Sequence, residues 1–154
     1  MLGPGDIVPD ARVWTAPEAE PTQLRDALGA GLVLLCFYPF DWSPTCTNEL
    51  LLLRERADDL RAAGIRPVAI SRDSPWSHRA WVEALGTHET VSLLSDWEGD
   101  AARAFGVEAT LDGMAVSARS AFLLDAGTVR AAWMLGTELP DIDAAIAAAS
   151  SLLP

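Results

Sequence analysis

A cysteine that closely follows a serine–proline pair is the feature of this sequence with the clearest chemistry. The stretch "FYPFDWSPTC" ends at Cys46, one of only two cysteines in 154 residues. Ser43 is a favoured N-cap, and Pro44 suits the first helical position because its missing N–H costs nothing there. Cys46 then falls in the first helical turn, where unpaired N–H groups and the helix dipole favour thiolate over thiol. The pattern predicts a nucleophilic cysteine at neutral pH.

Two neighbours of this cysteine have types that suit a reactive pocket. Pro39 offers a rigid, apolar wall that cannot donate a backbone hydrogen bond. The hydroxyl of Ser43 lies close enough in sequence to reach either the sulfur of Cys46 or an oxygen of a substrate.

The second cysteine, Cys36, has the opposite surroundings. It lies within "LVLLCFYPF", so we expect it to be buried in the core with a neutral thiol. The chain has no CxxC pair, and the spacing of its two cysteines matches neither a disulfide framework nor a zinc site. Ordinary thiol–disulfide oxidoreductase chemistry is therefore disfavoured, and no metal is expected.

A thiolate near a helix start also suits a hydrolase, which requires a histidine base. The candidates are His78 in "SPWSHRAW" and His88 in "GTHET". Both stand near expected helix ends, and we expect both to be solvated surface residues. A Cys–His hydrolase stays possible, but these contexts do not support it.

Apolar runs alternate with helix-period segments along the chain, which is typical of an α/β domain. A single domain over residues 1–154 is expected, with a mixed sheet, helices on both faces and a thioredoxin-like order of elements. An "AG" turn between two late apolar runs predicts an antiparallel hairpin. Strands are expected at 31–40, 66–71, 90–96, 119–125 and 128–135, and helices at 43–64, 74–86, 99–106 and 139–153.

The charge of the chain argues against two classes of partner. Its net charge is -11, with 22 acidic and 11 basic residues, which opposes binding to nucleic acid and to anionic membranes. No apolar run approaches the roughly 18 to 20 residues that span a bilayer. The start of the sequence lacks the features of a signal peptide, so a cytoplasmic location is expected.

With these residues in place, the sequence resembles a known family. "PFDWSPTC" fits the Pro-x-x-x-(Thr/Ser)-x-x-Cys signature of the peroxiredoxins, the alkyl hydroperoxide reductase/thiol-specific antioxidant family. The similarity continues through "CTNE" and, further along, through "AISRDSPWSHRAW", "SLLSD", "AARAFGV" and "RSAFLLDAGTVR". It covers most of the chain and implies a thioredoxin-like fold and a thiol-dependent peroxidase.

The resemblance also implies a role for each matching residue. Cys46 would be the peroxidatic cysteine, which attacks a hydroperoxide and becomes a sulfenic acid. Ser43 would hold the peroxide and Pro39 would shield the sulfenic acid from water. Arg119 would hydrogen-bond the thiolate and the substrate oxygens, and Glu49 would hold that arginine. A guanidinium stays charged at any working pH, so it suits this task on physical grounds as well.

The resemblance further implies partners and the second half of the cycle. No cofactor is implied. With only Cys36 available as a second thiol, we expect a one-cysteine enzyme whose sulfenic acid is reduced by an external thiol or redoxin. Trp42 and Trp81 are expected to pack near the pocket or at a subunit contact, and a homodimer is expected.

Three alternatives stay open. The protein would be a redox relay if Cys46 passed its oxidation to a partner protein through a mixed disulfide. It would be a non-catalytic thioredoxin-like dimer module if Cys46 were inert. A Cys36–Cys46 disulfide would make Cys36 a resolving thiol, at the cost of locally unfolding a core strand and a helix start.

Overall fold

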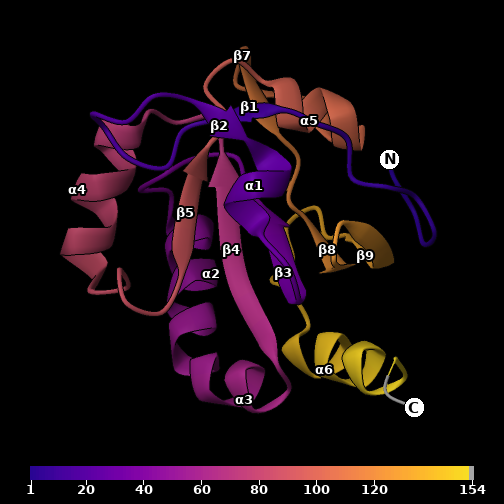
Figure 1. Cartoon of the computed structure of the whole chain (residues 1–154). Helices are drawn as coiled ribbons and strands as arrows, with labels where there is room; N and C mark the ends of the chain where they lie inside the picture. Colours follow the sequence, from indigo (N-terminus) through magenta and orange to yellow (C-terminus); the bar gives the residue numbers. More distant parts are fainter. Residues whose placement is uncertain (153–154) are drawn as a thin grey trace.

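A five-stranded mixed sheet forms the centre of the molecule, in the strand order β5-β4-β3-β8-β9 (Figure 1). The computed structural model describes residues 1–152. The sheet strands are β3 (Leu32–Phe37), β4 (Ile65–Ser71), β5 (Ser92–Ser95), β8 (Ser120–Asp125) and β9 (Thr128–Met134). The helices are α1 (Leu24–Leu28), α2 (Pro44–Glu55), α3 (Ala57–Ala62), α4 (Pro75–Leu85), α5 (Asp100–Phe105) and α6 (Ile142–Ser150).

Helices cover both faces of this sheet, as expected. The alternation of side chains along each strand divides the core in two. On one face, Phe37 and Phe122 pack with Phe105 of α5. On the other, Cys36 and Tyr38 belong to a cluster with residues of α2, α3, α4 and α6, including Trp81. The strand at the centre, β3, is almost continuously apolar because it is buried on both sides.

Three strand ends meet at one side of the molecule. Strands β3, β4 and β5 run parallel, so the segments that follow their carboxyl ends gather at the same edge of the sheet. Strand β8 lies antiparallel to β3, with Ser120 opposite Phe37. The residue just before β8 is therefore placed beside the end of β3, where the chain turns into α2.

The N-terminal segment connects the two edges of the sheet. Ile7 pairs with Thr128 on edge strand β9, and Trp14 pairs with Ser95 on the other edge strand, β5. Between these pairs the segment contributes buried apolar side chains to the core on the face of α1 and α5. This segment, residues 7–14, is called the N-terminal strap below.

Four features differ from the expected elements, and the first is the short helix α1, which was not expected. A two-stranded sheet, β1 (Arg12–Val13) with β2 (Thr22–Gln23), precedes α1, and a hairpin joins β6 (Glu108–Leu111) to β7 (Met114–Ser117). The expected helix at 43–64 is two helices, α2 and α3, because Arg56 leaves helical geometry between them. The guanidinium of Arg56 binds Asp59 and Asp143, contacts that helical periodicity does not encode.

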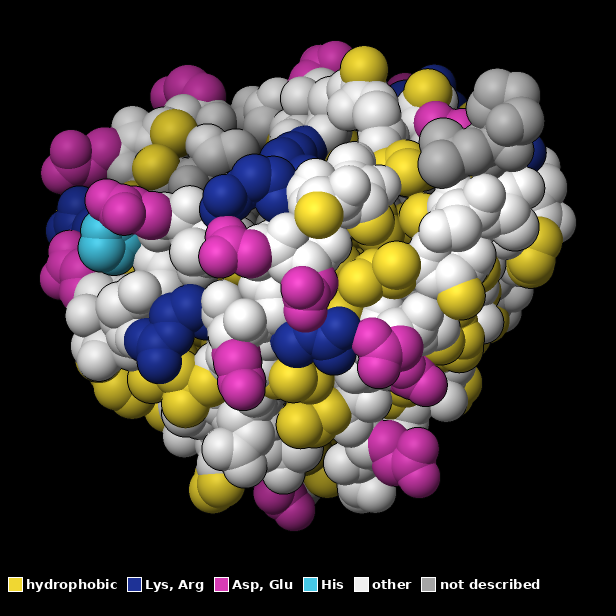
Figure 2. Space-filling view, turned by 90° about the horizontal axis from the view of Figure 1, so that it is seen from below, with side chains coloured by type: hydrophobic (Ala, Val, Ile, Leu, Met, Phe, Trp, Pro, Cys, Tyr) yellow, Lys and Arg dark blue, Asp and Glu magenta, His cyan; other side chains and the backbone are white. Residues whose placement is uncertain are grey.

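The surface mixes both signs of charge. On the face that carries α3 and α6, acidic and basic side chains are interspersed with hydrophobic ones and do not form a one-sign patch (Figure 2). Within residues 1–152, no helix is both long and apolar enough to cross a membrane.

Candidate active site

The start of α2 has the local structure that the sequence predicts. Ser43 is the N-cap, Pro44 is the first helical residue, and the Ser43 Oγ accepts a hydrogen bond from the Cys46 N–H at 3.2 Å. The Cys46 side chain lies in the first turn of the helix and is only 1% exposed. Pro39 is half-buried in the loop between β3 and α2. These residues place a thiol within the positively polarised end of the helix.

Arg119 brings a fixed positive charge to this thiol. Its Nη2 donates to the Cys46 Sγ at 3.2 Å, although 73 residues separate the two in sequence. The contact follows from the sheet, because Arg119 stands directly before β8 and β8 pairs with β3. The guanidinium is almost fully buried, which strengthens its electrostatic effect on a thiolate.

Glu49 holds the other side of the guanidinium. Its Oε2 accepts a hydrogen bond from Nη1 of Arg119 at 2.6 Å, and both side chains are buried. Glu49 lies one turn after Cys46 on α2, so the carboxylate and the sulfur face the same arginine. Burial raises the pKa of Glu49 from its ordinary 4.5 to about 7, and the opposing charge of Arg119 limits that rise.

Two polar atoms of this ion pair keep free hydrogen-bonding capacity. Nε of Arg119 and Oε1 of Glu49 are buried and have no partner among the described residues. A buried guanidinium N–H of this kind can donate to an oxygen of a substrate. Within the described part of the chain, no group of three or more His, Cys, Asp or Glu side chains is arranged to hold a metal ion.

The second cysteine is buried, as predicted. Cys36 is 0% exposed and lies opposite Ala69 and Ala121 in the middle of the sheet. Burial raises the pKa of its thiol well above the ordinary value, and the nearby Glu49 carboxylate adds to the rise. Both cysteines are free thiols.

The expectation of a solvated His78 is wrong. His78 is 5% exposed, and its Nδ1 lies 2.8 Å from the Asp41 Oδ2 while its Nε2 lies 3.0 Å from the Leu94 carbonyl oxygen. The contact is long-range: Asp41 follows β3, and His78 lies in the first turns of α4. Both residues follow neighbouring parallel strands, and this topology was the signal from which their proximity could have been predicted. His88 is exposed, as expected.

The two tryptophans near the signature differ from each other. Trp81 is buried and stacks against Tyr38 at 5.5 Å, as expected for packing. Trp42 is 55% exposed and adopts a φ of 72°. The left-handed conformation of Trp42 turns the loop between β3 and α2 and directs the indole outward.

The fold is that of a thioredoxin-like protein: a mixed sheet carries a thiol at a helix start, and a buried arginine contacts the sulfur. Comparison with known sequences identifies the family. The sequence profile of the AhpC/TSA family matches residues 4–132. The chain therefore belongs to this family, the peroxiredoxins, and the sequence-based resemblance is confirmed.

Individual relatives agree with the family assignment. The chain is 35% identical to "Probable peroxiredoxin prdx-3" of Caenorhabditis elegans, over 84% of this chain and 59% of that protein. It is 33% identical to the human "Thioredoxin-dependent peroxide reductase, mitochondrial", over 70% of this chain and 43% of that protein. The chain thus spans about half the length of these curated relatives.

A solved structure matches the whole fold. The crystal structure of peroxidoxin BcpB from Mycobacterium tuberculosis is similar with a TM-score of 0.84 and 26% identity, covering all of both chains. The thioredoxin-like fold expected from the sequence is confirmed by this match.

Proposed function

We propose that this protein is a thiol-dependent peroxidase that reduces hydrogen peroxide or organic hydroperoxides. The Cys46 thiolate attacks the terminal oxygen of the hydroperoxide, so that the S–O bond forms as the O–O bond breaks. The cysteine becomes a sulfenic acid, and the departing oxygen takes up a proton and leaves as water or an alcohol. The peroxide is reduced by two electrons and the sulfur is oxidised by two.

The observation that carries this proposal is the contact between Arg119 and Cys46. A guanidinium 3.2 Å from the sulfur stabilises the thiolate before attack and the charge that moves along the breaking O–O bond. The unpartnered Nε–H of Arg119 is available to the substrate. A module without chemistry has no need for a buried charge at a free thiol, because burying that charge costs free energy.

The remaining signature residues have supporting roles in this proposal. The Ser43 oxygen accepts from the backbone of Cys46, which leaves its hydroxyl proton free to bind a peroxide oxygen. Pro39, half-buried in the loop before α2, is assigned the wall without a hydrogen-bond donor that shields the sulfenic acid. Glu49 fixes the guanidinium of Arg119.

We further propose that an external thiol completes the cycle. One thiol attacks the sulfenic acid, forming a mixed disulfide and releasing water, and a second thiol then frees Cys46. The burial of Cys36 between β4 and β8 supports this one-cysteine scheme, because a Cys36–Cys46 disulfide would require the sheet to open. The name of the human relative indicates thioredoxin as a reductant for that protein, and a redoxin is the corresponding candidate here.

A homodimer formed at the active-site end of the sheet is part of the proposal. Trp42, Trp76 and Trp97 are each more than half exposed, and they follow the carboxyl ends of the parallel strands β3, β4 and β5. Large exposed aromatic side chains that gather on one side are typical of a subunit contact.

A cytoplasmic location is also proposed; it is supported by two free cysteines, which suit a reducing compartment.

The proposal is tested by oxidising the reduced protein with one equivalent of hydrogen peroxide in the presence of a sulfenic-acid trap. Intact and peptide masses are expected to show the adduct on Cys46 with Cys36 still reduced. A loss of two protons that links the cysteines would contradict the external reductant. If Cys46 did not react rapidly, the non-catalytic module would be the remaining interpretation. The redox relay would be indicated if Cys46 were oxidised once, then formed a stable disulfide with a partner protein and did not turn over on added thiol.

The role of Arg119 is tested separately with Arg119→Lys. A lysine keeps the charge but cannot reach Glu49 and the sulfur together through a planar fork. The second-order rate constant for Cys46 oxidation should fall by about 10²-fold or more, as for the loss of one donor to a developing negative charge. The exposed Arg61→Lys is the control, and equal rates for both variants would refute the role.

A further inference from the structure

A buried polar network holds the loop that leads into the active-site helix. Tyr38 donates its hydroxyl proton to Asp41 Oδ1 at 2.7 Å, and Ser77 donates to Asp41 Oδ2 at 2.8 Å. His78 Nδ1 lies 2.8 Å from the same Oδ2. Asp41 thus faces hydrogen-bonding groups from the end of β3 and from the first turns of α4, and its own side chain is completely buried.

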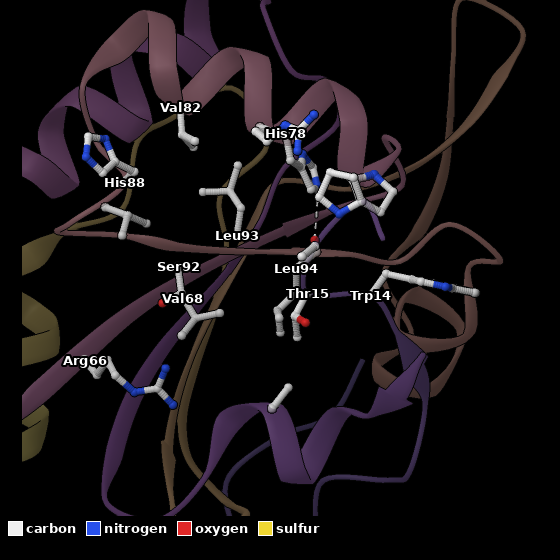
Figure 3. A pocket seen from close by; sticks show the side chains of 16 residues that line it. Trp14, Thr15, Arg66, Val68, His78, Val82, His88, Ser92, Leu93 and Leu94 are labelled. Carbon is white, nitrogen blue, oxygen red and sulfur yellow. Dashed lines mark hydrogen bonds between the residues drawn. The ribbon is translucent and has the colours of Figure 1, made fainter. Parts of the chain in front are cut away.

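The partners of the His78 ring determine where its protons lie. Nε2 faces the Leu94 carbonyl of β5, which can only accept, so Nε2 carries a proton (Figure 3). Nδ1 faces the Asp41 carboxyl group, whose oxygens already accept from two hydroxyl groups. One proton shared between Nδ1 of His78 and Oδ2 of Asp41 satisfies both groups, so a buried hydrogen bond joins α4 to the loop.

The backbone of Asp41 is hydrogen-bonded as well as its side chain. Its N–H donates to Asp73 Oδ2 at 2.9 Å, and the Ser71 hydroxyl donates to the same oxygen at 2.6 Å. Desolvation raises the pKa of Asp73, and the proximity of Asp41 adds to the rise. The loop is therefore attached to the end of β4 as well as to α4 and β5.

The next residue of the loop requires this support. Trp42 adopts a φ of 72°, a left-handed conformation that is unfavourable for a non-glycine residue and persists only where the surroundings impose it. The Asp41 network fixes the loop on one side of Trp42, and the Ser43 cap fixes it on the other. Release of Asp41 would let the strained residue relax and move its neighbours.

We propose that His78 is a positioning residue for peroxide reduction: through its buried hydrogen bond with Asp41 it holds the loop that carries Pro39 and Ser43, next to Cys46. This positioning role rests on the proposed peroxidase function. His78 does not touch the sulfur; it acts through Asp41. His78 also lines a cavity of about 390 Å³, together with other residues of α4 and β5 (Figure 3).

The test compares two reactions of Cys46 in His78→Gln. Oxidation by hydrogen peroxide requires the loop to hold the substrate, whereas alkylation by iodoacetamide requires only an accessible thiolate. The peroxide rate constant should fall at least tenfold, because small displacements of positioning groups cost about 10²-fold. The alkylation rate should stay the same or rise, because a freed loop exposes the buried Cys46. His88→Gln, on the exposed histidine, should change neither rate.

A second measurement does not depend on peroxidase activity. Hydrogen exchange of the backbone amides of residues 40–43 should become at least tenfold faster in His78→Gln, with exchange in β3 unchanged. Should this variant fail to fold, Asp41→Asn provides the same comparison, because an amide has one acceptor oxygen and cannot keep the contacts with Tyr38, Ser77 and His78 together.

The outcomes separate the two proposals. A wild-type protein that does not react with peroxide refutes the peroxidase function, and the exchange of residues 40–43 still decides whether His78 holds the loop. A His78 variant with unchanged peroxide rate, with equal losses in both reactions, or with unchanged exchange at 40–43 overturns the positioning role.

Discussion

The environment of Cys46 depends on one buried pair of charges. Arg119 bonds both to the sulfur and to Glu49, so the carboxylate determines where the positive charge lies. Removing Glu49 from water disfavours its ionised form, and its pKa rises to about 7. The charge state of this residue therefore changes near neutral pH, unlike that of an ordinary surface carboxylate.

The pKa of Glu49 predicts a pH-dependent stability. Between pH 4.5 and 7 the folded protein binds more protons at this residue than the unfolded chain does, so stability falls as pH rises through this window. The contribution is up to about 3 kcal/mol. The free energy of unfolding, measured in urea at pH 5 and pH 8, should decline less in Glu49→Gln than in the wild type.

A surface carboxylate on the same helix provides the control for this prediction. Glu55 is exposed at the end of α2, so Glu55→Gln should keep the decline of the wild type. The cause assigned to the pH dependence is wrong if Glu49→Gln and the wild type decline equally.

At the scale of elements, two helices of this protein begin in the same way. Ser43 and Ser74 are N-caps, each followed by proline, and each side chain accepts the N–H three residues on, at 3.2 Å in α2 and 3.1 Å in α4. Only the α2 start carries a cysteine at that third position. Comparing the two N-cap serines therefore separates what a cap contributes to the stability of its helix from what it contributes to the chemistry of Cys46.

This similarity gives a matched pair of substitutions. Ser43→Ala and Ser74→Ala should each lower the free energy of unfolding by about 1 kcal/mol, because each removes one cap hydrogen bond. Only Ser43→Ala should also slow the oxidation of Cys46 by peroxide, measured under pseudo-first-order conditions. Equal peroxide rates in both variants would show that the Ser43 hydroxyl serves the helix alone.

Local sequence signals were sufficient for the elements that meet at Cys46. The Ser-Pro start of α2, the buried Cys36 strand and the β8–β9 hairpin were predicted because propensity and alternation act over a few residues. The β6–β7 hairpin was missed because its side chains are mostly exposed, so apolar alternation is weak. Asp112 and Gly113, both at positive φ, were the available turn signal.

Cys46 and its neighbours Ser43 and Pro39 were predictable from local sequence, whereas the roles of Arg119 and Glu49 were predictable only with the family resemblance. Sequence spacing alone does not bring Arg119 to Cys46, because the contact depends on the register between β3 and β8. The buried pair of His78 and Asp41 was missed for the same reason. Helix position suggested exposure for His78, whereas the packing of α4 against β5 and the loop after β3 encloses it.

At the scale of the whole molecule, the exposed tryptophans predict a dimer in solution. Sedimentation velocity at tens of micromolar should give twice the mass of one chain for the wild type. Trp76→Ser should shift the protein towards monomer, because Trp76 is 54% exposed at the start of α4 and would be buried at the contact. Met134→Ser removes an equally exposed side chain from β9 and should leave the dimer intact. A monomeric wild type would contradict the proposal.

Residues 1–154 as a single domain remain a prediction. The described residues support it through one central sheet whose two faces are covered by helices from along the chain.

The net charge of the chain affects the approach of a reductant. Because this charge is -11, an acidic reductant protein would be repelled, and added salt would weaken the repulsion.

The N-terminal strap has a consequence for the order in which the molecule is made. Its two pairing partners, Ser95 and Thr128, leave the ribosome long after the strap itself. Each end of the strap therefore stays unpaired until the edge strand that it pairs with has been synthesised. While the strap is unpaired, its free backbone N–H and C=O groups can pair with neighbouring nascent chains.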